Sequence, residues 1–181
     1  MEEDLQDINS LPVYDKDSLT SAFSFLEEHP FLPWKYIKEG CSSRAHYACQ
    51  ILKSKMQLET AKAWAFSERK LGVGDNLLHP KILPPNHGWH LHVAPAIRTR
   101  GEDDAIIWAV IDPTVATGCL PYNTWHAMLS GANSRRGLLP RRIYEPGSYT
   151  LRDDGLEFYD IKFDDDLFTS IANIKSIWNN M

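Results

Sequence analysis

Three residues of the chain carry the side chains of a thiol acyl-transfer site: Cys41, His92 and Asp112. In such a site a thiol attacks an acyl carbon, an imidazole moves protons, and a carboxylate orients the imidazole. Each residue taken alone is more often structural, because core cysteines, satisfied histidines and aspartates before proline are common. Together, in this order along the chain, they predict a catalytic triad, provided that the fold brings them into contact.

The apolar pattern after Cys41 predicts a helix over residues 42–56, because apolar side chains recur at helical spacing at Ala45, Ala48, Cys49, Leu52 and Met56. Gly40 permits an unusual backbone turn into this helix. A helix N-terminus carries partial positive charge and unpaired N–H groups, which favour a thiolate and can hold an oxyanion. Cys49 lies on the apolar side of the helix, and we interpret it as a core residue.

Two segments, residues 89–96 and 105–111, predict the strands of an antiparallel hairpin. If its polar turn is centred on Glu102, His92 and Asp112 lie directly opposite each other. Cross-strand neighbours have Cβ atoms about 4.5–5.5 Å apart, close enough for an imidazole–carboxylate hydrogen bond. The register is the assumption in this prediction, because a bulge would shift it.

A metal site is the competing interpretation of the histidines. His90 and His92 share one face of the predicted strand, and His79 and His87 are nearby in the sequence. A His-x-His pair can bind zinc, but the sequence lacks further ligands at the usual spacing and has no His-Glu-x-x-His motif. In the predicted register His90 faces Thr114, beyond the end of pairing. We therefore prefer His92 as the reactive histidine and predict no metal and no cofactor.

Composition places the chain among ordinary globular proteins. It has 181 residues, of which 43% are hydrophobic and 24% charged, and its formal net charge is −5. This acidic balance disfavours a nucleic-acid binder. A secreted disulfide scaffold usually has more than three cysteines, and an even number of them. The acidic start of the sequence and the lack of a long apolar run lead us to expect no secretory signal and no membrane span. We expect a monomer, cytoplasmic as synthesised, and leave open its delivery elsewhere without a cleaved signal.

We expect a flexible N-terminal segment over residues 1–15 and a single catalytic domain over residues 16–181. The pattern predicts an α+β fold in which an antiparallel sheet packs against the helix that bears the cysteine at its N-terminus. The other predicted elements are a helix capped by Asp17 or Ser18, a strand over residues 60–66, a short helix capped by Asn123 or Thr124, two strands around Asp153-Asp154-Gly155, and a final helix with an apolar stripe from Leu167 to Trp178.

At these residues the sequence resembles the bacterial protein-glutaminase family, the protein-glutamine deamidases. The matching pieces fall in the family's order within about residues 34–115: Gly40-Cys41, Arg44-Ala45-His46, Ile51-Leu52, Trp89, His92-Val93-Ala94-Pro95 and Ile111-Asp112-Pro113. The resemblance implies a papain- and transglutaminase-like fold with Cys41, His92 and Asp112 as its triad. It also implies hydrolysis of glutamine side chains in proteins to glutamate, with release of ammonia from a thioester intermediate.

The chain departs from the family pattern after the nucleophile, where Ser42-Ser43 replaces a bulkier residue, and residues 116–181 have no match. We expect Ser42, Trp89, Arg44 and His46 to bind substrate or to support the site. A transglutaminase, a thiol peptidase and a non-enzymatic binding module on the same fold remain alternatives. The expected partner is a protein that presents glutamine, and the sequence leaves open which protein this is and whether a pro-segment or inhibitor controls the site.

Overall fold

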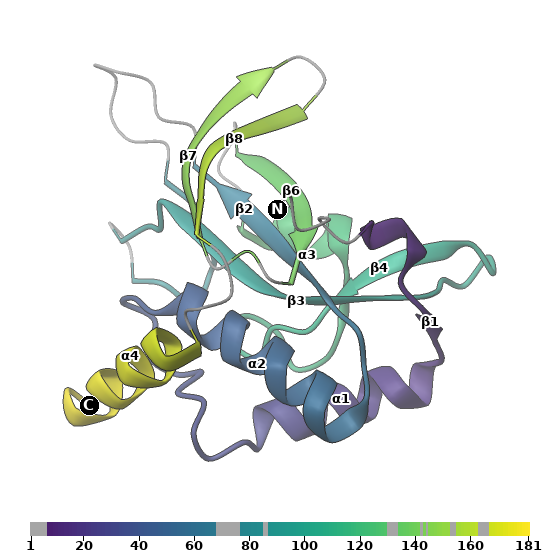
Figure 1. Ribbon diagram of the computed structural model, residues 1–181, viewed down its shortest axis with the longest axis horizontal. Coiled ribbons are helices and arrows are strands. Elements are labelled where there is room, and N and C mark those ends of the chain that lie inside the picture. Colours follow the sequence, from purple (N-terminus) through teal and green to yellow (C-terminus); the bar gives the residue numbers. More distant parts are fainter. Residues whose placement is uncertain are drawn as a thin grey trace, which may run out of the picture.

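The computed structural model describes residues 7–67, 77–84, 87–129, 134–141, 143, 145–152, 155–162 and 167–181. It shows an α+β fold in which helices cover a largely antiparallel sheet (Figure 1). The helices are α1 (Lys16–Glu27), α2 (Cys41–Met56), α3 (Tyr122–Leu129) and α4 (Leu167–Asn179), with a short 3-10 helix, η1 (Ile8–Ser10), ahead of them. The predicted fold class and the predicted helix after Gly40 are confirmed.

Six of the described strands form one sheet in the order β5-β4-β3-β2-β6, with β1 pairing to β3 beyond the end of β2. Their bounds are β1 (Val13–Tyr14), β2 (Ala61–Phe66), β3 (Leu91–Arg100), β4 (Ile106–Val110), β5 (Leu120–Pro121) and β6 (Arg135–Pro140). All pairs are antiparallel except β1 with β3. A separate hairpin joins β7 (Glu145–Arg152) to β8 (Gly155–Lys162), which confirms the two strands predicted around Asp153-Asp154-Gly155.

The hairpin of β3 and β4 differs in register from the prediction. Arg100 pairs with Ile106, so the loop between the strands is centred on Asp103 and not on Glu102. The physical reason lies in the loop, where Asp104 adopts a left-handed conformation with φ 63°. Aspartate tolerates this conformation better than most residues, and a single residue in it changes where two strands can begin to pair.

The shifted register separates the two residues that were expected to face each other. Pairing between β3 and β4 ends at Val110, so Asp112 lies beyond the ladder. In the sheet, His92 is instead the neighbour of Ala65 on β2. The prediction of a cross-strand pair between His92 and Asp112 is therefore wrong, and their contact has to come from the loop that follows β4.

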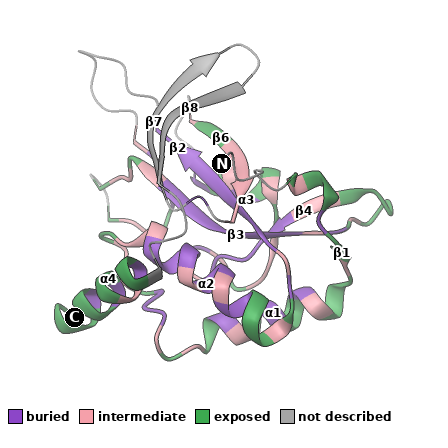
Figure 2. Cartoon of the chain, viewed as in Figure 1, coloured by how far each residue is buried: buried purple, intermediate pink, exposed green. Residues whose placement is uncertain are grey.

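The central strands β2 and β3 are buried on both faces, as Figure 2 shows. On the face toward α2, Trp64 and Val93 pack with Ala45. On the opposite face, Ala94 packs with Trp125 of α3. Because alternate residues of a strand point to opposite faces, β3 delivers side chains to both layers of the core.

Residues 8–14, within the segment expected to be flexible, contact β3. Tyr14 pairs with Thr99, whose hydroxyl donates to the Tyr14 carbonyl at 2.8 Å. Leu11 is buried, and its carbonyl accepts a hydrogen bond from the Arg98 guanidinium at 2.7 Å. These contacts lie far apart in the sequence, which is why a polar, aperiodic segment gave no sign of them. Residues 1–6 are outside the described ranges.

The helix boundaries are close to the predicted ones. α1 is capped by Asp15, whose carboxylate accepts from the Ser18 N–H at 2.8 Å, two residues before the nearer predicted cap. α3 begins at Tyr122, one residue before the nearer of its two predicted caps. Within the described ranges, no helix combines the length and the apolar character that a membrane crossing requires.

Gly40 determines how the chain enters α2. It is the N-cap and has a φ of 83°, in the left-handed region where a side chain is strained. A Cβ at this position would also lie 2.4 Å from Cδ1 of Ile177 on α4. The glycine therefore allows both the turn before Cys41 and the close approach of α4 to the start of α2.

We expect Gly40→Ala to lower the free energy of unfolding by about 1–2 kcal/mol, the usual cost of a left-handed conformation for a residue with a Cβ. Ile177 adds to this cost to the extent that its flexible end cannot move aside. Gly118→Ala is the matched control, because a Cβ there meets nothing within 4 Å. Denaturant unfolding of both variants measures the difference, and equal stability of the two would contradict this account of Gly40.

Candidate active site

Cys41 is the first residue of α2, at the positive end of the helix. Its N-cap, Gly40, has no side chain to accept a hydrogen bond from the first N–H groups of the helix. Two features at this end therefore favour negative charge: the helix dipole and the uncapped amide donors. The Cys41 side chain is partly exposed, and it is a free thiol, as are Cys49 and Cys119.

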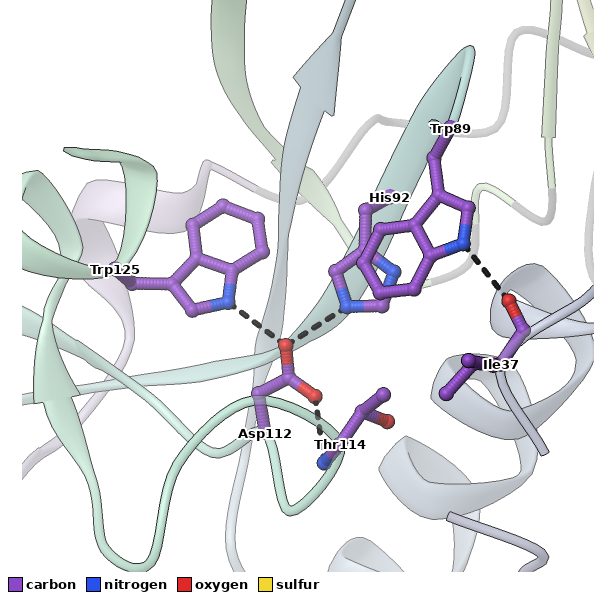
Figure 3. Close-up of polar contacts among 6 residues, drawn as sticks. All are labelled: Ile37, Trp89, His92, Asp112, Thr114 and Trp125. Atoms are coloured by element: carbon purple, nitrogen blue, oxygen red, sulfur yellow. Dashed lines mark hydrogen bonds and ion pairs between the residues drawn. The ribbon is translucent and has the colours of Figure 1, made fainter. Parts of the chain in front are cut away.

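His92 and Asp112 form a buried pair. Nε2 of His92 lies 2.8 Å from Oδ2 of Asp112, and both side chains are only 2% exposed. Asp112 accepts two more hydrogen bonds: the Trp125 indole N–H donates to Oδ2 at 2.8 Å, and the Thr114 backbone N–H donates to Oδ1 at 3.1 Å (Figure 3). The contact predicted between His92 and Asp112 thus exists, although the predicted route to it was wrong.

The thiol and the imidazole come from opposite sides of the sheet and meet at its end. His92 is a sheet neighbour of Ala65, which belongs to the core on the α3 side. Cys41 and Leu91 instead pack against the cluster that includes Ala45, on the α2 side. His92 is the second residue of β3, so its ring lies where the strand starts and can be reached from either side. A hydrogen bond and the charge of His92 lower the pKa of the Cys41 thiol, so the two side chains interact there. Since Asp112 occupies Nε2, Nδ1 is the ring nitrogen that remains for the thiol.

The pKa values of the three groups are coupled. Burial alone would lower the pKa of His92, but the charge and hydrogen bond of Asp112, assisted by Cys41, raise it to about 9. Burial would raise the pKa of Cys41, whereas the hydrogen bond and charge of His92, followed by Arg44 and Ser42, bring it below its ordinary value. Burial would also raise the pKa of Asp112, and His92 foremost lowers it. The arrangement favours a thiolate, an imidazolium and a carboxylate at neutral pH.

Arg44 supplies a second buried cation near the thiol. It lies one helical turn after Cys41, is 2% exposed, and donates from Nη1 to the Glu39 carbonyl at 2.9 Å. Burial lowers the pKa of this guanidinium, while the negative charges of Cys41 and Asp112 oppose the effect. The site thus holds two groups that become negative and two that become positive, so the charges balance within a water-poor region.

A cleft of about 370 Å³ opens beside the thiol. Its walls are the segment that leads into α2, the start of that helix, the segment before β3, and one residue of α4. The lining includes Cys41, Ser42, Trp89, His92 and Asn173. A side chain that enters this cleft reaches the sulfur of Cys41 with the imidazole of His92 beside it.

Trp89 covers the imidazole. Its ring stacks on that of His92 with centroids 4.4 Å apart and planes at 18°, and its indole N–H donates to the Ile37 carbonyl at 2.8 Å (Figure 3). The stacked indole shields one face of the imidazole from water. Trp89 therefore connects His92 to the segment that leads to Cys41, and it also lines the cleft.

The other predicted support residues lie in different places. Ser42 lines the cleft next to the thiol. His46 is fully buried in α2, where its Nδ1 lies 2.8 Å from Nζ of Lys62 on β2, so it connects the helix to the sheet and does not line the cleft. His90 is exposed at the rim of the cleft, and Nδ1 of His79 lies 2.9 Å from the His87 carbonyl. Within the described ranges, no cluster of three or more potential metal-ligating side chains occurs.

Two residues at the site were not predicted from the sequence. Trp125 contacts Asp112 from α3, and Asn173 of α4 donates to the Ser43 hydroxyl at 3.1 Å at the edge of the cleft. Both lie after residue 115, where the motifs that carried the resemblance end. Trp125 sits at a buried position of a short helix, and only the approach of α3 to the loop after β4 reveals its polar contact.

Comparisons with known proteins identify the family of the chain. Residues 19–129 match the sequence model of a family described as Glutaminase. No curated protein sequence matches the chain significantly. The family expected from the resemblance is thus confirmed over more than half of the chain.

Solved structures show the same fold at low sequence identity. A crystal structure of protein-glutaminase is 16% identical, with a TM-score of 0.67 over 90% of this chain and 86% of its own. An NMR structure of protein-glutaminase from Chryseobacterium proteolyticum is 15% identical, with a TM-score of 0.65 over the same shares. A mutant of pro-protein-glutaminase is 17% identical, with a TM-score of 0.69, and the match covers 97% of this chain but 62% of that longer one. The chain therefore belongs to the glutaminase family, is a glutamine-deamidating enzyme, and has the protein-glutaminase fold.

Proposed function

We propose that the chain deamidates glutamine side chains of proteins, with Cys41 as nucleophile, His92 as proton carrier and Asp112 as the group that orients His92. One observation carries the assignment of roles: a buried imidazole–carboxylate pair lies at a thiol on a helix N-terminus, and the hydrogen bond and charge of the imidazole lower the pKa of that thiol. These three side chains together supply a nucleophile, a general acid and a general base in one place.

The reaction proceeds in two halves. The Cys41 thiolate attacks the side-chain carbonyl carbon of glutamine, and the His92 imidazolium gives its proton to the departing nitrogen, which leaves as ammonia. A γ-glutamyl thioester on Cys41 remains. His92, now neutral, takes a proton from water as the water attacks the thioester, and glutamate leaves while the thiolate and imidazolium are restored. The net change is amide plus water to carboxylate plus ammonium.

The tetrahedral intermediates of both halves carry an oxyanion that needs hydrogen-bond donors. The first N–H groups of α2 are suited to this, because they have no capping side chain and they surround the nucleophile. Arg44 keeps the Glu39 carbonyl turned toward its guanidinium, which holds the backbone ahead of Cys41 in place. Trp89 keeps water from one face of the imidazole, and His46 supports α2 from within the core.

We expect Cys41→Ala to abolish the release of ammonia from a glutamine-rich protein such as casein. Intact-mass analysis gives the direct readout, because each deamidation replaces NH by O and adds about one dalton. Cys119→Ala is the matched control: burial raises the pKa of this thiol to about 11, and it lies outside the cleft, so activity is retained. Undiminished deamidation by Cys41→Ala would refute the proposal, and cross-linking of an added amine would indicate transfer to amines in place of hydrolysis.

The coupled pKa values predict a window of activity. The thiolate of Cys41 forms at a pH below the ordinary thiol value, and the imidazolium of His92 is lost as the pH rises through about 9. We expect kcat to fall above that pH, because His92 no longer carries the proton that the leaving nitrogen needs.

Asp112→Asn tests the coupling. Without the carboxylate charge the pKa of His92 falls, the imidazolium is lost at lower pH, and the pKa of Cys41 rises. Iodoacetamide alkylation of Cys41, followed by mass spectrometry across pH, measures the ionisation of the thiol without any substrate. An unchanged alkylation profile in Asp112→Asn would contradict the coupling, and Cys119 serves as an internal reference thiol.

Two substitutions of Arg44 separate its charge from its hydrogen bond. Arg44→Lys keeps a cation near the thiol, whereas Arg44→Gln keeps an N–H donor for the Glu39 carbonyl and removes the charge. If the charge stabilises the thiolate, the alkylation profile of Cys41 moves to higher pH in Arg44→Gln and moves less in Arg44→Lys. The reverse order would assign Arg44 an anchoring role alone, and circular dichroism establishes that both variants are folded.

A further inference from the structure

Trp125 is a fully buried tryptophan on α3 that the proposed chemistry does not use directly. Its indole N–H donates to Oδ2 of Asp112 at 2.8 Å, and this is the same oxygen that binds His92. Figure 3 shows the indole and the imidazole reaching this oxygen from two sides. Since an indole N–H can only donate, the contact requires an acceptor and favours the ionised form of the carboxylate.

Both oxygens of Asp112 are held. Oδ2 accepts from His92 and Trp125, and Oδ1 accepts from the Thr114 N–H. The carbonyl of Asp112 also accepts from the N–H groups of Val115 and Ala116. A carboxylate with donors on both oxygens and an anchored backbone cannot rotate away from the imidazole without losing a hydrogen bond in a buried region.

The imidazole itself lies near two indoles. Trp89 stacks on it at 4.4 Å, and the Trp125 ring centroid is 6.0 Å away with its plane at 30°. His92, Asp112 and Trp125 are each at most 2% exposed. In such a dry environment one hydrogen bond to a carboxylate has a larger effect on its charge and orientation than it has in water.

We propose that Trp125 is a positioning residue of the active site, whose indole N–H keeps Asp112 ionised and turned toward His92. The proposal rests on the proposed roles of Cys41, His92 and Asp112. It places α3, which packs on the opposite face of the sheet from α2, among the elements that the reaction depends on. The indole N–H affects the ionisation of the Cys41 thiol only through Asp112 and His92.

The charged neighbours of Asp112 agree with this role. His92 on β3 faces it directly, and Arg44 on α2 interacts with it through its charge. On α3, His126 bonds to the Ser134 hydroxyl at 3.0 Å, and its pKa is lowered by burial and by the charge of Arg136 on β6. Burial would raise the pKa of Asp112, whereas His92 foremost, and then Trp125 and Thr114, lower it.

Trp125→Phe tests the proposal, because phenylalanine keeps an aromatic body and removes only the donor and part of the ring. We expect kcat to fall about tenfold, as for one lost hydrogen bond to a charged group, with KM within about twofold of the native value. The acid limb of the kcat/KM profile moves to higher pH, because Asp112 has lost a donor that favours its ionised form. Trp34→Phe is the matched control, since Trp34 is also buried and its indole N–H donates to the Leu26 carbonyl, away from Asp112.

A double-mutant cycle identifies the route of the effect. The rate of Cys41 alkylation is measured in the native chain, Trp125→Phe, Asp112→Asn and the double variant, each verified as folded by circular dichroism. If Trp125 acts through Asp112, its substitution changes the rate in the native background and causes no further change in the Asp112→Asn background, where the carboxylate charge is already gone. Equal effects in both backgrounds, or a shift of the pH profile in Trp34→Phe as large as in Trp125→Phe, would overturn the proposal.

Failure of the role proposed for Trp125 and failure of the proposed function give different results. If the native chain deamidates protein and Cys41→Ala does not, the triad stands whatever Trp125→Phe does. An unshifted profile and an unchanged kcat in Trp125→Phe would then refute the role of Trp125 alone. Persistent activity in Cys41→Ala would instead refute the triad.

Discussion

The buried contact between His92 and Asp112 is the interaction on which the rest of the site depends. Two ionised side chains that are almost completely removed from water are costly unless each is paired and hydrogen-bonded. The structure meets this condition with compensating neighbours: the thiol of Cys41 on the other side of the imidazole, the guanidinium of Arg44 near the thiol, and donors on both oxygens of the carboxylate. Each charge is tolerated because the others are present.

This balance links catalysis to folding. The pKa of His92 is raised from 6.5 to about 9, so its pairing stabilises the folded state fully below 6.5 and loses that contribution as the pH rises through about 9. The pKa of Asp112 is lowered, so its contribution is present above 3.8 and is lost as the pH falls through the lower folded value. The range in which the pair stabilises the protein overlaps the range in which the thiolate and imidazolium coexist.

The site is assembled where the sheet ends. α2 brings the thiol from one face, β3 brings the imidazole from the other, and the loop after β4 brings the carboxylate across to meet it. Gly40 makes the position of the thiol possible, because its left-handed turn starts the helix at Cys41 and leaves space for Ile177 of α4. A glutaminase needs an open approach to the sulfur and a closed environment around the imidazole and carboxylate, and the end of a strand offers both.

Local pattern in the sequence indicated the helix after Gly40 and the strand that carries His92, and it pointed to the residues of the proposed triad, because helical and strand periodicity and motif spacing are local properties. Alternation along a strand identifies the face that a residue occupies but not its partner, so the β3–β4 register was missed: it depends on the conformation of one loop residue, Asp104. The contact of Trp125 with Asp112 likewise has no local signature. Only the tertiary structure decided these features, since they arise from packing a helix and a loop against opposite sides of one strand end.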